Sequence, residues 1–563
     1  MNRISRFLIL LSLGLKAFGS SDRSMVYGFD NIESSPDLLW TPCFDQFNCS
    51  RLEVPVDYSN KSVGTTSIAF IKTAGKNATV KSPSIVLIPG GPGSSGIDLL
   101  LSFPSLLGEI LGEQYNFVSF DPRGVNNSGL HLDCFSGNTE ARSAFNQLHR
   151  TGQTNISSTA FKEQYYSSSI YGEWCNSAVE KNSSYSYYVT TPAVARDLLT
   201  FTEVEAKVVG DSPSDAKLWA YGVSYGTVIG STFASMFPER VGRMVLDGVL
   251  NAEQYYDNYW TDNVDQMDEA MGTFSTFCHS AGPENCSFWG PTPANITARI
   301  DTIISQLLNS PVPLSGVDDL SLPTMVTYSD LKTLFLNTIY QPIALFPTMA
   351  DILHEVEGGN LTALAGLYEE SAPVTDARLA ITCTDSYARN RLTSIEEFRA
   401  WSEYTTSKSK YIGDVYPTFL EGILCRSFRP QLPDSMLVQG EVSALHPPTS
   451  FPILFASNTI DPITPLESAR KMSSRFAGSV LLKQEAVGMP LSFNDSLPVI
   501  STGIPFIYLS IAQDEVVWMS AILAIHPSVS DTRNTLRSTR LSLAVLITSI
   551  LSLGGRAFQG GGG

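Results

Sequence analysis

The 563-residue sequence is short of basic residues, with 37 lysines and arginines against 55 aspartates and glutamates and a formal net charge of −18. Nucleic-acid binding needs lysine and arginine to neutralise phosphates, so this deficit argues against a nucleic-acid partner. Charged residues make up only 16% of the chain and hydrophobic residues 43%, which excludes a disordered polyanion. The length is enough for two or three domains, or for one large domain with a long insertion.

The sequence also lacks CxxC pairs and any cysteine–histidine spacing typical of zinc sites, and we expect no metal or other cofactor. Residues 1–20 combine Arg3 and Arg6 with a short apolar run, the pattern of a secretory signal peptide rather than of a membrane span; the alternative is a buried N-terminal helix. An even number of cysteines in a secreted chain predicts disulfides, although sequence does not fix their connectivity. Sequential pairing is the simplest arrangement: Cys43–Cys49, Cys134–Cys175, Cys278–Cys286 and Cys383–Cys425.

Acceptor motifs for N-glycosylation are frequent in this chain. Ten asparagines stand in N-x-S/T motifs, namely Asn48, Asn60, Asn77, Asn126, Asn155, Asn182, Asn285, Asn295, Asn360 and Asn494. Together with the signal pattern, they predict a glycosylated protein that is secreted into the extracellular space.

Strand-like apolar runs recur near both ends of the chain. They lie at 51–58, 65–75, 82–91, 116–121, 217–224, 242–249, 451–461 and 478–488. Helical periodicity follows several of them, at 99–111, 225–237 and 468–476. Strands that alternate with helices predict an α/β fold with a doubly wound, mostly parallel sheet, whose ligands bind at the carboxyl ends of the strands.

The middle of the chain has a different pattern. From 251 to about 440 the apolar residues recur every three or four positions, which predicts a helical cap inserted between two strands of one sheet. The expected organisation is therefore a core in two parts, 21–250 and 441–488, with the cap at 251–440. Residues 135–185 are rich in serine and asparagine, and we interpret them as a long loop or an excursion from the core.

Gly222-Val223-Ser224-Tyr225-Gly226 lies between a predicted strand and a predicted helix, as a nucleophile elbow requires. The chain has to turn sharply with Ser224 at the apex, and any side chain at the flanking glycines would collide with the neighbouring turn. The alternative is an ordinary strand–helix turn. With the strand and helix in place, the motif favours Ser224 as a catalytic nucleophile.

Two further loops follow predicted strands at the same edge of the sheet. The glycine-rich loop at 89–93 suits an oxyanion loop, in which the N–H of Gly91, or else Gly90, pairs with the N–H of Tyr225. Asp461 directly follows strand 451–460 and can orient an imidazole; Asp247 is the rival acid. The segment at 121–124 is expected to hold the oxyanion loop through an internal ion pair.

The motifs GGPGSSG, FDPRG, VARDLL, WAYGVSYGT, FPERVGRMVLDGV and DPITP occur in that order. This set resembles the α/β-hydrolase serine peptidases of the proline iminopeptidase and tripeptidyl aminopeptidase group, in particular their secreted members. The resemblance runs from about residue 40 to about residue 488. It implies cleavage of short units from free peptide N-termini, with Ser224 as nucleophile, Asp461 as triad acid, and Gly91 with Tyr225 as oxyanion donors.

One element of that pattern is missing. The resemblance places a catalytic histidine in a Gly-His-Cys loop after the last strand, but here the loop reads Ala486-Val487-Gly488-Met489-Pro490. After Asp461 the only histidine is His526, the one candidate base that keeps the serine–acid–histidine order. The other histidines, His131, His149, His279, His354 and His446, all precede Asp461. As written, the chain is expected to be severely weakened in catalysis.

Residues 489–563 look foreign to the family, and our hypothesis is that the gene model departs from its proper reading there, through a retained intron or a missed splice. The alternative for the apolar stretch 541–553 is a lipid-anchoring signal or a helix lying on a membrane, not a stable span.

The sequence thus leaves three functions open. The first is a secreted aminopeptidase, in which cap carboxylates such as Asp257, Asp262 or Asp385 bind the substrate amine. The second is an esterase with the same machinery, since a fold does not determine its substrate. The third is a catalytically impaired binding protein. The expected partner is a peptide or an ester.

Overall fold

The computed structural model describes residues 25–489 except 103–105, 183–184, 316–322, 371–374, 421 and 439. Its centre is a sheet in the order β1-β3-β4-β6-β5-β7-β8-β11-β12, with β2 beside β3. The strands are β1 (Ser34–Ser35), β2 (Thr41–Cys43), β3 (Phe47–Pro55), β4 (Thr65–Ala74), β5 (Ser84–Ile88), β6 (Asn116–Phe120), β7 (Leu218–Val223), β8 (Val241–Asp247), β11 (Ile453–Ile460) and β12 (Val480–Val487). All neighbours from β6 to β12 are parallel, whereas β4 pairs antiparallel with β3 and β6.

The central strands are apolar on both faces because each face is covered by helices. In β5, Ile85 and Leu87 pack with α1 (Gly96–Ser102) and α2 (Leu106–Leu111), whereas Val86 and Ile88 belong to the core on the opposite face. That opposite core contains α5 (Thr191–Val209), α6 (Tyr225–Met236) and α16 (Leu466–Ser474). The predicted doubly wound, mostly parallel sheet is confirmed.

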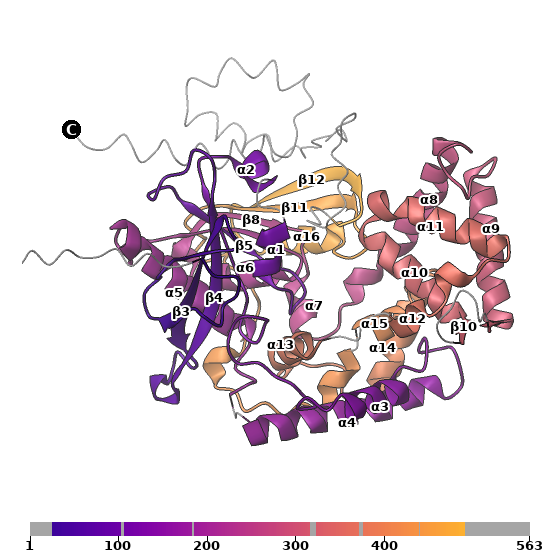
Figure 1. Cartoon of the computed structure of the whole chain (residues 1–563), viewed down its shortest axis with the longest axis horizontal. Helices are drawn as coiled ribbons and strands as arrows, with labels where there is room; N and C mark the ends of the chain where they lie inside the picture. The colour runs from indigo at the N-terminus through magenta and orange to yellow at the C-terminus, as the bar shows by residue number, and fades with distance from the viewer. Residues whose placement is uncertain are drawn as a thin grey trace, which may run out of the picture.

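A mainly helical cap stands between β8 and β11 and fills the right-hand side of Figure 1. Its α-helices are α7 (Ala252–Tyr256), α8 (Met267–Ala281), α9 (Pro293–Asn309), α10 (Tyr328–Tyr340), α11 (Pro342–Glu357), α12 (Leu367–Glu370), α13 (Asp376–Ser386), α14 (Ile395–Lys408) and α15 (Tyr416–Leu420). A small antiparallel pair, β9 (Val312–Leu314) and β10 (Thr324–Val326), joins them. The described residues also form short 3₁₀ helices: η1 (Lys61–Val63), η2 (Pro238–Arg240), η3 (Thr261–Val264), η4 (Thr362–Leu364), η5 (Gly422–Ser427) and η6 (Asp434–Met436).

The interpretation of 135–185 as a loop is wrong. The segment forms α3 (Thr139–His149) and α4 (Ala160–Asn182), which run along the cap at the bottom of Figure 1. Tyr171, Cys175 and Val179 are spaced four apart and form a buried stripe on α4 that packs against cap residues such as Leu379. The many serines and asparagines between these positions hid the stripe in the sequence.

All eight cysteines form disulfides, and they do so in sequential pairs: Cys43–Cys49, Cys134–Cys175, Cys278–Cys286 and Cys383–Cys425. Two of the bonds close short loops. The other two tie α4 to the loop after β6, and α13 to η5, on the side where α4 packs on the cap.

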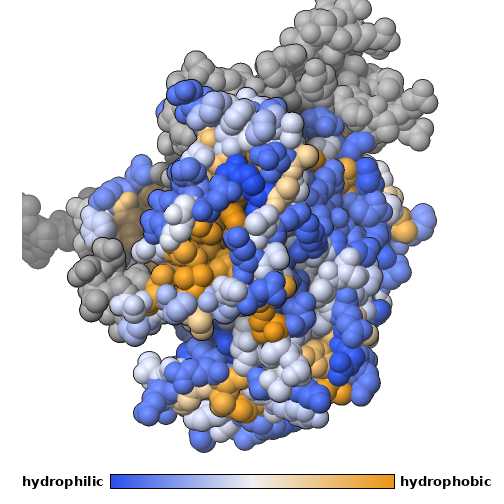
Figure 2. All heavy atoms as spheres, turned by 90° about the vertical axis from the view of Figure 1, so that its right-hand side faces the viewer, coloured by the Kyte–Doolittle hydropathy of each residue, from blue (hydrophilic) through white to orange (hydrophobic). Residues whose placement is uncertain are grey.

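The face of the molecule on the cap side is mostly hydrophilic, with hydrophobic side chains gathered in a few patches (Figure 2). Large apolar side chains exposed on the cap include Phe277, Leu308, Met325 and Ile343. Among the residues that the structure describes, no helix has both the length and the apolar character needed to cross a bilayer.

Candidate active site

Ser224 occupies a strained turn between β7 and α6. Its φ is 55° and its ψ is −121°, a conformation that non-glycine residues rarely adopt. A Cβ on Gly222 would lie 2.6 Å from the carbonyl oxygen of Gly226, and a Cβ on Gly226 would lie 2.4 Å from that of Ile88. The two glycines therefore permit the turn. The backbone N–H of Ser224 donates to the backbone carbonyl of Asp247 at 3.1 Å, and the side chain of Ser224 stays partly exposed in a cavity.

The loop after β5 passes directly over Ser224. A Cβ on Gly90 would lie 3.1 Å from the Cβ of Ser224 and 3.6 Å from its Oγ. Gly91 follows with a φ of 109°, where a side chain would be strained and would meet the backbone N of Gly93 at 2.8 Å. The loop and the N-terminus of α6, which begins at Tyr225, thus face the same serine, the arrangement in which backbone N–H groups can receive a negative oxygen.

Asp121 holds this loop, but not in the way the sequence suggested. Its carboxylate accepts hydrogen bonds from Ser95 Oγ at 2.6 Å and from the N–H of Ile97 at 3.2 Å. The ion pair belongs to Arg123, which binds Asp197 through two nitrogens at 2.6 and 2.7 Å. The expectation that an ion pair holds the loop is therefore wrong: hydrogen bonds do so, and the buried ion pair fixes α5 instead.

Asp461 is fully buried immediately after β11. Its carboxylate accepts from the N–H groups of Ile463 at 2.9 Å and Thr464 at 2.8 Å, and from the hydroxyl of Thr464 at 2.6 Å. Burial is the main reason that its pKa is raised to about 7; the hydrogen bonds from Thr464 and Ile463 act to lower the pKa, and the charge of Asp247 contributes to raising it. The two carboxylates are therefore electrostatic neighbours.

Asp247, the rival acid, ends β8 between the strands of Ser224 and Asp461. It is fully buried and accepts a hydrogen bond from the hydroxyl of Tyr221, while its Oδ1 has no partner among the described residues. Burial raises its pKa to about 7 against the opposing effect of that hydrogen bond. Asp461, with three donors, is the better satisfied of the two acids.

The cavity over Ser224 has a volume of about 550 Å³ and is roofed by the cap. Gly90, Gly91 and Ser224 line it on the core side. Its apolar and aromatic lining includes Leu250, Trp260, Tyr340, Tyr416, Phe419 and Ile463. Two charged side chains also line it: Asp98 on α1 and Arg378 on α13.

The structure does not bring a histidine to this cavity from the described residues. His131 contacts the carbonyl of Asn126, His149 is buried against Ser167, and His279 contacts the carbonyl of Gly290. His354 and His446 are exposed elsewhere. His526, with the whole 490–563 segment, lies outside the described residues.

Met489 lines the cavity at the place after the last strand where the resemblance expects the histidine. The backbone there is closely held: the N–H of Gly488 donates to Ile460 at 2.9 Å, and Asn458 donates to the carbonyl of Gly488 at 2.6 Å. Gly488 has a φ of 99°, so its left-handed turn suits glycine. The loop therefore brings residue 489 to the cavity of Ser224, with a thioether in place of an imidazole.

The cap carboxylates considered for an amine are all engaged elsewhere. Asp257 forms ion pairs with Arg389 and Arg391, and Asp262 with Lys471. Asp385 is buried and accepts hydrogen bonds from Thr191 and Tyr255. Burial raises the pKa of Asp385 to about 7. None of them lines the cavity, so these expectations are wrong.

Sequence reasoning missed Asp98 and Arg378. Asp98 follows the glycine-rich loop by only a few residues, a proximity that could have pointed to it. For Arg378 the sequence holds no comparable signal, because the residue reaches the cavity only through the folding of the cap. No group of three or more histidine, cysteine or carboxylate side chains in the described residues could hold a metal ion.

Comparisons with known proteins agree with this geometry. Residues 83–277 match the family model described as alpha/beta hydrolase fold, and residues 430–499 match the one described as TAP-like protein. The chain is 28% identical over 467 residues to the serine protease Hip1 of Mycobacterium tuberculosis (strain ATCC 25618 / H37Rv), covering 78% of this chain and 83% of Hip1. It is 25% identical over 479 residues to the tripeptidyl aminopeptidase of Streptomyces lividans, covering 80% of each. It is also 24% identical to the putative hydrolase YuaR of Escherichia coli (strain K12), covering 80% of this chain and 82% of YuaR.

Proposed function

Because the chain belongs to the α/β-hydrolase group that includes serine peptidases, we propose that it is a secreted serine hydrolase built to release short peptides or residues from free N-termini. The observation that carries the proposal is the strained turn of Ser224, which opens into a cavity roofed by the cap.

The reaction assigned to this site is acyl transfer. Ser224 Oγ attacks the carbonyl carbon of the substrate, and the negative oxygen that forms is held by the N–H groups of Gly91 and Tyr225, with Gly90 as the alternative to Gly91. As the C–N bond breaks, the leaving amine takes up the proton that the Ser224 hydroxyl gave up; water then attacks the acyl carbon, the product leaves as a carboxylic acid, and Ser224 regains its proton. Asp461 would orient and stabilise the imidazole that moves these protons.

Two features of the cavity, its cover by the cap and Asp98, support the proposed preference for a free N-terminus. A cavity partly covered by the cap favours a chain end over an internal bond, because an internal bond would have to carry chain on both sides. The carboxylate of Asp98 lines the cavity and forms no ion pair within the described part of the chain, which suits an ammonium group.

The chain as written has the site without its base, and this limits the activity we expect. Met489 cannot accept the proton of Ser224, and His526 remains the only candidate base in the expected chain order. An esterase is the second candidate function, since esters have better leaving groups and need less protonation. A binding protein that retains the cavity without turnover is the third.

Secretion is supported by two features of the fold. All eight cysteines are in disulfides, which persist in oxidising compartments. The sequon asparagines whose side chains the structure describes are all exposed, as glycosylation requires: Asn48, Asn60, Asn77, Asn126, Asn155, Asn285, Asn295 and Asn360.

The test is active-site labelling followed by substrate comparison. A fluorophosphonate probe is expected to modify Ser224 slowly, with Ser224→Ala as the unlabelled control. Tripeptide amides, single-residue amides and short acyl esters are then compared in one assay. Ester turnover without amide turnover would favour the esterase. Failure to label Ser224 in the folded protein would leave only the binding protein.

A further inference from the structure

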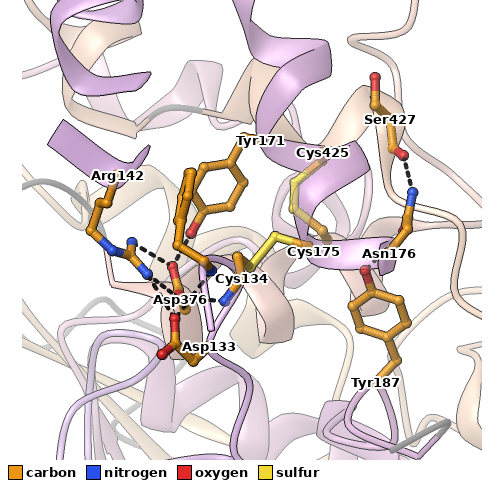
Figure 3. The surroundings of a disulfide bond; sticks show 12 residues. Asp133, Cys134, Arg142, Tyr171, Cys175, Asn176, Tyr187, Asp376, Cys425 and Ser427 are labelled. Carbon is orange, nitrogen blue, oxygen red and sulfur yellow. Dashed lines mark hydrogen bonds and ion pairs between the residues drawn. A yellow bond between two sulfur atoms is a disulfide. The ribbon is translucent and has the colours of Figure 1, made fainter. Parts of the chain in front are cut away.

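Helix α13 is fastened to the rest of the molecule at both ends. At its start, Asp376 accepts hydrogen bonds from Arg142 and from the hydroxyl of Tyr171, and its Oδ2 accepts from the N–H of Cys134 at 2.9 Å. Figure 3 shows these groups converging beside the Cys134–Cys175 disulfide. Near its end, Cys383 is bonded to Cys425.

The first turn of α13 rests on the oxyanion loop. A Cβ on Gly93 would lie 2.9 Å from the backbone N of Arg378, so the two backbones are in close contact there. The guanidinium of Arg378 lies 5.3 Å from the centre of the Phe419 ring, and both residues line the cavity of Ser224. Arg378 is therefore a cation placed in the cavity by a fixed helix.

Within the described part of the chain, Arg378 forms no ion pair and its guanidinium donates no hydrogen bond, although Asp98 lines the same cavity. Its charge is nevertheless felt in the cavity wall. Burial raises the pKa of Tyr340 to about 12, and the positive charge of Arg378 acts to lower it. A guanidinium in a partly closed, aromatic cavity is stabilised by an anion that enters with two oxygens.

We propose that Arg378 binds a carboxylate of the substrate, so that the preferred substrates are short peptides with a negative charge. The inference rests on the proposed function, since it names the substrate class of the same cavity. Two sources offer this chemistry: the free C-terminal carboxylate of a short peptide, and an acidic side chain. With Asp98 taking the amine, a short peptide with both termini free would have each terminal charge matched.

The experiment measures binding, so that it does not depend on turnover. The full chain with Ser224→Ala is titrated calorimetrically with two matched pairs of peptides. Ala-Ala-Ala against its C-terminal amide tests the free terminus, and Ala-Ala-Glu-amide against Ala-Ala-Gln-amide tests the side chain. In at least one pair the charged member is expected to bind at least about tenfold more tightly.

Variants then assign this preference to one residue. Arg378→Gln is expected to bring the ratio within the pair to about one, and Arg378→Lys to retain part of it because the charge remains. Arg399→Gln is the matched control, since Arg399 also lies over a phenylalanine ring, that of Phe161, but lines a different pocket. It should leave the ratio unchanged. Thermal unfolding checks that each variant is folded.

Several outcomes would overturn the inference: ratios near one in both pairs before Arg378 is changed, a ratio that survives Arg378→Gln, or no binding of any peptide. Labelling of Ser224 by a fluorophosphonate is read separately on the unaltered serine. Labelling without a charge preference would remove the carboxylate proposal alone, whereas a charge preference without labelling would remove the hydrolase proposal and leave Arg378 as a carboxylate site.

Discussion

The two halves of the candidate site differ in how complete they are. The nucleophile half, made of the loop 89–96 and the turn 222–226, has its serine, its glycines and two sets of backbone N–H groups around one point. The acid–base half is made of the loops 461–465 and 488–489. It has a buried carboxylate, and hydrogen bonds hold the backbone of both loops, but residue 489 is methionine and not a base.

The difference shows that backbone shape and side-chain chemistry are separate requirements. Gly226 in the first half and Gly488 in the second both stand where a Cβ would collide, with the carbonyl of Ile88 at 2.4 Å and with the ring of Pro342 at 2.5 Å. The backbone conformation of both loops therefore requires glycine at these positions. Only the loop 488–489 lacks its chemical group, an imidazole that could transfer protons to and from Ser224.

Completing the acid–base half should have the largest effect. Met489→His places an imidazole at the cavity of Ser224, and general acid–base catalysis contributes about 10²–10⁴-fold, so kcat/KM on peptide amides or esters is expected to rise by that order. Stopped assays on the purified full chain measure it.

Controls for this gain come from the same cavity. Met489→Leu keeps the volume and should give no gain, and adding Asp461→Asn to Met489→His should largely remove it, because the imidazole loses its orienting carboxylate. If Met489→His is folded but no faster, while His526→Ala slows labelling of Ser224, the base is His526 and the comparison between the halves fails.

Breaking the nucleophile half should cost stability. Gly226→Ala places a Cβ 2.4 Å from the carbonyl oxygen of Ile88, and we expect a loss of about 2–3 kcal/mol in the free energy of unfolding, measured by urea denaturation. Gly272→Ala, in α8 with open space around it, is the matched control and should stabilise by about 0.5–1 kcal/mol. Equal effects in the two variants would contradict the steric account of the turn.

Asp247 lies between the two halves, and changing it should have the smallest of the expected effects. Its raised pKa means that the folded state holds a proton more tightly than the unfolded state, so its contribution to stability is present below about pH 4 and is lost as pH rises to about 7. Asp247→Asn should flatten the fall in unfolding free energy between pH 4 and 8 by about 1–3 kcal/mol. The exposed Asp215, changed to Asn, is the control; an unchanged slope in Asp247→Asn would disprove this account.

The sequence predicted those parts of the site that depend on local pattern. The turn at Ser224 follows from glycine spacing between an apolar strand and a helix, and the position of Asp461 from the end of a strand. The helices at 139–149 and 160–182 were missed because a narrow apolar stripe in polar surroundings is a weak signal. Asp98 and Arg378 were missed because a side chain's access to a cavity depends on packing between distant segments.

The fastening of α13 has a consequence for how ligands reach Ser224. A helix bonded to its neighbours by a carboxylate network at one end and a disulfide near the other cannot swing aside as a hinged flap. Passage past α13 is then limited by the size of the incoming molecule, because this helix cannot move to widen the opening.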